Sequence, residues 1–166
     1  MSEHPPALGW EPATEHVRQG TELLARLAET GGRLLLIKDG SVLFTGHEPG
    51  IGSLLEAIHR LTAAELRAAH AADAVVGKAG ALLLAYAEVG FVAGWMMSSS
   101  GAETLRAHGI AFHARTMVPT IRGKNADPRC PFERAVENVT DPYRAVRILT
   151  ELSRAPASRA PQPRAQ

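Results

Sequence analysis

Two stretches of this sequence bring hydrogen-bond donors to the point where an apolar run ends. The first, Asp73–Lys78, reads DAVVGK, so a glycine and then an ammonium follow a short apolar run. The second is the serine triplet Ser98–Ser100, which follows the run GFVAGWMM. If each stretch leads from a strand into a helix, the unpaired N–H groups and partial positive charge of the helix start attract an anion. The pattern therefore predicts a pocket for a small anionic or nucleotide-like molecule.

A basic stretch farther along the chain is expected to contact the same ligand. It carries Arg122 and Lys124 and belongs to the loop after the last predicted strand. Each of these features also has an ordinary structural explanation, because glycine forms turns, serine caps helices and basic loop residues are usually solvated. Both explanations stay open. The predicted ligand-binding residues are Asp73, Gly77, Lys78, Ser98, Ser99, Ser100, Arg122 and Lys124.

The single cysteine, Cys130, is the candidate nucleophile. It precedes Pro131, a residue favoured in the first turn of a helix, and it follows Arg129. Helix starts and neighbouring cations both favour a reactive thiolate. A nucleophile also needs a base within reach, and the sequence does not place His108 or His113 near this thiol. Because a small buried cysteine is common in protein cores, catalysis and packing both stay open.

Composition and motif spacing exclude several classes of protein. The chain has 166 residues, 45% of them hydrophobic and 21% charged, which suits one globular domain. A formal net charge of +1 argues against a nucleic-acid polymer as partner. One cysteine and seven scattered histidines give neither a disulfide nor metal-ligand spacing, so no metal and no cofactor are predicted. No apolar run of bilayer length and no signal peptide are present, so we expect a cytoplasmic protein without membrane contact.

Apolar periodicity predicts one α/β domain over residues 14–152, between a flexible arm, 1–13, and a disordered tail, 153–166. Asp39-Gly40 predicts a tight hairpin turn between two strands. The alternation of strands and helices after it is typical of βαβ crossovers and a parallel sheet, whose ligands bind at the carboxyl ends of the strands. Strands are expected at Arg33–Lys38, Ser41–Thr45, Ala74–Val76, Gly90–Met97 and Ile110–Met117. Helices are expected after the cap residue Thr14 up to Gly31-Gly32, after Ser53, at Ala63–His70, Lys78–Ala87 and Ala102–His108, and from near Pro131 and Pro142.

Three segments together resemble the bacterial and archaeal family called domain of unknown function 1893. They are IKDGSVLF from Ile37, DAVVGKA from Asp73, and VPTIRGKN from Val118 with CPFE from Cys130 and the pair Asp141-Pro142. The resemblance covers about residues 15–152. It implies a cytidine-deaminase-like fold, a three-layer α/β/α domain with a mixed sheet.

The resemblance does not imply deamination. Zinc deaminases hold the metal with His or Cys at one helix start and with Pro-Cys-x-x-Cys at the next, and a nearby Glu moves protons. The corresponding stretches here, Val76–Ala79 and Met97–Gly101, lack the zinc ligands and the catalytic Glu.

Three functions fit these observations. The first is a binding module for a small anionic or nucleotide-like molecule. The second is a transferase or hydrolase that uses Cys130. The third is a non-catalytic module that forms homo-oligomers through an apolar surface containing Trp95, Met96 and Met97, although these three residues are expected mainly in the core of the sheet.

Overall fold

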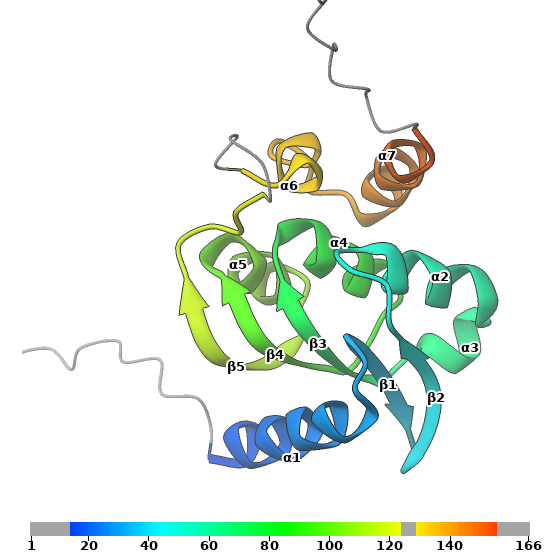
Figure 1. The fold of residues 1–166 in the computed structure, drawn as a ribbon, viewed down its shortest axis with the longest axis vertical. Coiled ribbons are helices and arrows are strands. Elements are labelled where there is room, and N and C mark those ends of the chain that lie inside the picture. Colours follow the sequence, from blue (N-terminus) through cyan, green and yellow to red (C-terminus); the bar gives the residue numbers. More distant parts are fainter. Residues whose placement is uncertain (1–13, 124–128, 156–166) are drawn as a thin grey trace, which may run out of the picture.

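A mixed five-stranded sheet organises the chain (Figure 1). The computed structural model describes residues 14–123 and 129–155, so the predictions for residues 1–13, for Lys124 and for residues 156–166 lie outside the described residues. The elements are α1 (Thr14–Thr30), β1 (Leu34–Lys38), β2 (Ser41–Gly46), α2 (Gly52–Arg60), α3 (Ala63–Leu66), β3 (His70–Val76), α4 (Lys78–Tyr86), β4 (Phe91–Ser98), α5 (Ser99–Ala107), β5 (Ala111–Val118), α6 (Pro131–Ala135) and α7 (Pro142–Arg154).

The strands lie in the order β2-β1-β3-β4-β5. β1 is antiparallel to both of its neighbours, whereas β3, β4 and β5 are mutually parallel. The prediction of a mixed α/β sheet that begins with a hairpin is therefore confirmed. Figure 1 shows the arrowheads of β3, β4 and β5 pointing toward the edge where α6 lies. The carboxyl ends of these three strands lie at that edge, and both predicted donor stretches lie there too.

The turn between β1 and β2 has the predicted geometry. Asp39 has a φ of 49° and Gly40 a φ of 78°. A tight hairpin turn needs positive φ at both central residues, and Asp followed by Gly tolerates it better than most pairs. α1 ends in the same way, because Gly31 has a φ of 66° directly after the helix.

Both faces of the sheet are apolar and are covered by helices, so the central strands are buried. In β1, Leu35 and Ile37 pack with α1, while Leu34 and Leu36 belong to a second cluster that includes α4, α5 and α7. Alternate residues of a strand point to opposite faces, so α1 lies on one face and these other helices lie on the other. α4 sits deep in the second cluster, since Ala79 and every residue from Gly80 to Leu84 are buried.

The structure corrects one boundary in the middle of the chain. The sequence predicts a helix over Ala63–His70 and a strand that begins at Ala74, but α3 ends at Leu66 and β3 begins at His70. Ala68, with a φ of 60°, turns the chain between them. The segment from His70 is rich in alanine, a strong helix former, yet it pairs with strands on both sides. Tertiary pairing therefore overrides local propensity.

A second boundary differs near the C-terminus. α7 continues to Arg154, past the predicted domain end at residue 152. Asp141 caps this helix, because its carboxylate accepts the N–H groups of Tyr143 and Arg144. Among the described residues, no helix is both long and apolar enough to span a bilayer.

The apolar side chains proposed for an oligomer surface differ in how far they are buried. Met97 is fully buried and Trp95 is partly buried, with the Arg115 guanidinium 4.6 Å from the centre of its ring. Met96 is 39% exposed. The expectation of a core position therefore holds for Met97, largely for Trp95, and not for Met96.

Asp73 is a buried acid in the middle of the sheet. It is 5% exposed and lies between Leu34 of β1 and Gly94 of β4. Its carboxyl accepts the Val75 N–H at 3.2 Å. Burial raises the pKa of Asp73 to about 7, although the N–H groups of Val75 and Ala74 and the charge of Arg33 act in the opposite direction.

We expect this carboxyl to make the protein less stable as pH rises. In the unfolded chain it ionises near its ordinary pKa of 3.8, whereas in the folded chain it stays protonated up to about pH 7. Between these values the unfolded state binds fewer protons, so the free energy of unfolding falls by up to about 1.4 kcal/mol per pH unit. Asp73→Asn removes the titration. Urea denaturation at pH 4 and pH 8 should show the variant gaining stability over wild type only at the higher pH; a difference that does not depend on pH would contradict this prediction.

Candidate functional site

The two predicted donor stretches lie side by side at the carboxyl edge of the parallel strands. Gly77 precedes α4, and Ser98 precedes α5. A Cβ atom added to Gly101, in the first turn of α5, would stand 2.7 Å from the Val76 carbonyl oxygen and 3.1 Å from the Gly77 carbonyl carbon. The first turn of α5 therefore packs directly on the turn that leads into α4, and a glycine is required for this close approach.

A carboxylate of the protein itself occupies the start of α4. One Glu133 oxygen, Oε2, accepts the Lys78 N–H at 2.9 Å, and the other, Oε1, accepts the Ala79 N–H at 2.8 Å. A Cβ atom on Gly77 would overlap this carboxylate, so Gly77 makes room for it. The sequence predicted an anion at these N–H groups. The anion in the structure is Glu133, from the Cys-Pro-Phe-Glu segment of α6.

The Lys78 side chain links α4 to the residues that follow α6. Its ammonium donates to the Glu137 carbonyl oxygen at 2.6 Å, just beyond α6. Arg129 adds an exposed ion pair with the Glu137 carboxylate at 3.0 Å. α6 has no fully buried residue, and it is held by the hydrogen bonds of Glu133 and Lys78, by the partly buried Phe132 and by the buried Val136 directly after the helix.

The three serines have different positions at the start of α5. Ser98 is fully buried, and its hydroxyl oxygen accepts the Gly101 N–H at 3.0 Å. The Ser100 hydroxyl lies 3.1 Å from that of Ser98. Ser99 is exposed. Ser98 is thus a helix cap, and of the three serines it is Ser100 that lines a cavity.

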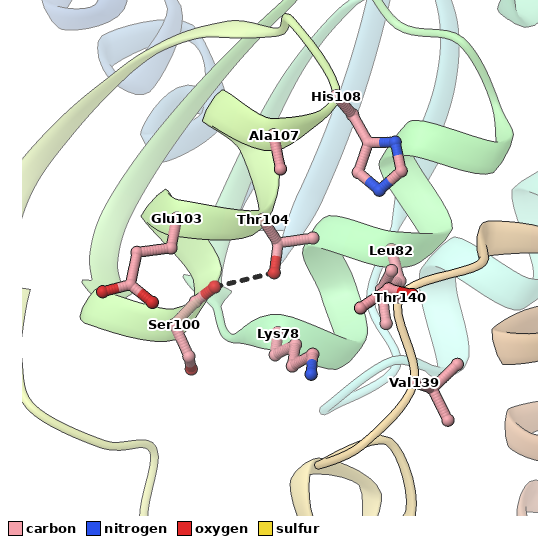
Figure 2. A pocket seen from close by; sticks show the side chains of 9 residues that line it. All are labelled: Lys78, Leu82, Ser100, Glu103, Thr104, Ala107, His108, Val139 and Thr140. Carbon is pink, nitrogen blue, oxygen red and sulfur yellow. Dashed lines mark hydrogen bonds between the residues drawn. The ribbon is translucent and has the colours of Figure 1, made fainter.

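Two neighbouring cavities open beside Lys78. They share Lys78, Ser100 and Glu103 as lining residues. Figure 2 shows the smaller one, of 220 Å³, between α4, α5 and the segment that leads into α7; its other lining residues are Leu82, Thr104, Ala107, His108, Val139 and Thr140. The larger one, of 360 Å³, is lined in addition by Thr120, Ile121, Arg129, Glu133, Arg134 and Glu137.

Several predicted site residues lie away from these cavities. Asp73 is in the interior of β3 and lines neither of them. Arg122 is exposed and lines neither. Sequence reasoning missed the role of Glu133 because it lies 55 positions from Lys78, and no spacing rule connects such distant residues.

Cys130 occupies the N-cap position of α6 without a capping hydrogen bond from its side chain, and it is half-buried. Its backbone N–H donates to the Ile121 carbonyl oxygen at 3.3 Å. His113 packs against Gly20 of α1, on the other side of the sheet, where burial lowers the pKa of the imidazole. His108 lines the smaller cavity, which does not include Cys130. A nucleophilic role for Cys130 stays a prediction.

Within residues 14–123 and 129–155, no group of three or more His, Cys, Asp and Glu side chains could hold a metal ion.

We expect Glu133 to be the main polar anchor of α6. Glu133→Gln leaves one oxygen for two N–H donors and removes the charge that favours a helix start, so the free energy of unfolding should fall by about 1–2 kcal/mol. Glu137→Gln is the matched control, because it breaks an exposed ion pair worth roughly 0–1 kcal/mol and keeps the backbone carbonyl that binds Lys78. Urea denaturation measures both variants. Equal losses would show that the carboxylate of Glu133 has no special role.

Comparison with known proteins identifies the family. No curated protein matches the chain. A solved structure of a DUF1893 family protein, TM1506 from Thermotoga maritima, is similar with a TM-score of 0.71 and 22% sequence identity, over 86% of this chain and 92% of that chain. At this identity the similarity shows the fold alone. The family model TM1506, a domain of unknown function (DUF1893), matches residues 23–152, so this chain belongs to the DUF1893 family.

Proposed function

We propose that this protein binds a small anionic molecule in the groove formed by the two cavities, with Lys78 and Ser100 as the principal contacts. The observation that carries the proposal is the position of the Lys78 ammonium. It lines both cavities, and among the described residues its one acceptor is the Glu137 carbonyl oxygen. A lysine ammonium has three N–H donors. Two donors are therefore left for a phosphate or carboxylate group.

Three carboxylates line the groove; two of them are paired with donors of the protein, and the third, Glu103, is an exposed residue that lines both cavities. The Glu133 carboxylate is directed at the N–H groups of α4, and the Glu137 carboxylate pairs with Arg129. These two negative charges are thus compensated locally. Arg129 and Arg134 also line the larger cavity, and Ser100 lines both cavities together with Lys78 and offers a neutral hydroxyl.

The place of the groove in the fold supports the same conclusion. In open α/β sheets, ligands bind outside the carboxyl ends of the strands, and this groove lies at the ends of β3, β4 and β5. The cavity volumes of 220 and 360 Å³ together fall within the usual range for small-molecule sites, roughly 300–1,000 Å³.

The cytidine-deaminase-like fold stays part of this proposal. The support for it is the order of elements, a hairpin followed by parallel strands joined through α4 and α5. The starts of these helices carry Gly77-Lys78-Ala79 and Ser98–Gly101 where a zinc deaminase carries metal ligands and a catalytic Glu. We propose that the cleft is used for binding an anion through an ammonium.

We expect inorganic phosphate to bind to the wild-type protein and to depend on Lys78. Lys78→Gln removes the charge and should raise the dissociation constant about tenfold or more, because charge-assisted hydrogen bonds are roughly twice as strong as neutral ones. Lys78→Arg keeps the charge and should retain most of the affinity. Isothermal titration calorimetry at low salt measures all three proteins, and the melting temperature without phosphate checks that each is folded. Phosphate binding that is equal in wild type and Lys78→Gln would refute the proposal.

A further inference from the structure

The smaller cavity has the size of a site for a ring. Its volume is 220 Å³. An apolar cavity of about 150 Å³ in another protein holds benzene, so this cavity has room for a six-membered ring with a small substituent. It opens beside Lys78 and Ser100, the two groups to which we assign the anionic part of the ligand.

The walls of this cavity suit an apolar or aromatic body. Leu82 and Val139 are buried apolar residues, and Ala107 closes the wall from the last turn of α5. The Thr104 hydroxyl donates to the Ser100 carbonyl oxygen at 2.8 Å, which turns its methyl group toward Leu82 (Figure 2). His108 stands at the rim.

The larger cavity offers a ring a poorer environment. Its lining includes Arg129, Glu133, Arg134 and Glu137. A ring placed there would remove water from charged groups without supplying hydrogen bonds in return, which is unfavourable. A ligand with hydroxyl groups, such as a sugar phosphate, would suit that cavity better. With the anionic group held at Lys78, the smaller cavity thus favours a ring and the larger cavity favours a hydroxylated group.

We propose that the ligand is a ring-bearing anion, with its charged group at Lys78 and Ser100 and its ring in the smaller cavity against Leu82, Ala107 and Val139. This inference rests on the proposed function. It names the class of ligand as an aromatic phosphate or carboxylate of the size of phenyl phosphate.

The test compares three probes that share one anionic group: phenyl phosphate, glycerol 3-phosphate and inorganic phosphate. Isothermal titration calorimetry with the full chain should give phenyl phosphate a dissociation constant about tenfold or more below those of the other two. Ala107→Trp fills the smaller cavity from an exposed position, so on this variant the dissociation constant of phenyl phosphate should come close to that of inorganic phosphate. Ala25→Trp is the matched control, because Ala25 is an exposed residue of α1 on the opposite face of the sheet; it should keep the advantage.

Two results would overturn the inference and leave the proposed function standing. One is glycerol 3-phosphate binding as tightly as phenyl phosphate, and the other is a phenyl phosphate advantage that survives Ala107→Trp, each with phosphate binding that still depends on Lys78. If none of the three probes binds to the wild-type protein, the proposed function fails as well.

Discussion

The contact between the Glu133 carboxylate and the start of α4 determines how the carboxyl edge of this sheet is built. A helix start presents N–H groups that have no partner within the helix, and a buried start needs an acceptor from elsewhere. Here both carboxylate oxygens supply it, at 2.9 Å and 2.8 Å. The arrangement resembles the way in which a helix start binds phosphate, except that the anion is covalently attached to the protein. As a result, α6 packs against the start of α4.

That contact also shapes the groove. With α6 held over α4, the Lys78 side chain extends to the Glu137 carbonyl oxygen and lines both cavities. The α4 start itself is already satisfied by Glu133, so an external anion has to be held by side chains, Lys78 and Ser100 among them. The proposed binding site is therefore next to the helix starts, and of the donors that the sequence predicts it uses the side chains of Lys78 and Ser100 instead of the backbone N–H groups of α4.

Close packing around the central strands imposes a second constraint. β3 and β4 are covered on both faces, and their interior positions hold small residues such as Ala71, Ala72, Ala93 and Gly94. Small side chains let helices approach the sheet closely. Asp73 is the exception, and its burial raises the pKa of the carboxyl to about 7. Stability and pH are coupled through this residue, which is remote from the groove.

The sequence by itself determined the features that depend on neighbouring residues. Asp39-Gly40 fixed the hairpin, because positive φ at both turn residues is a local requirement, and the valines before Gly77 and the serines after Met97 marked two strand-to-helix transitions. The tertiary structure decided the rest. Pairing on both sides made a strand of the alanine-rich segment at His70, and Glu133 binds the N–H groups of Lys78 and Ala79, which lie 55 and 54 positions away in the chain. Such contacts are set by how separate elements pack, and no local periodicity encodes them.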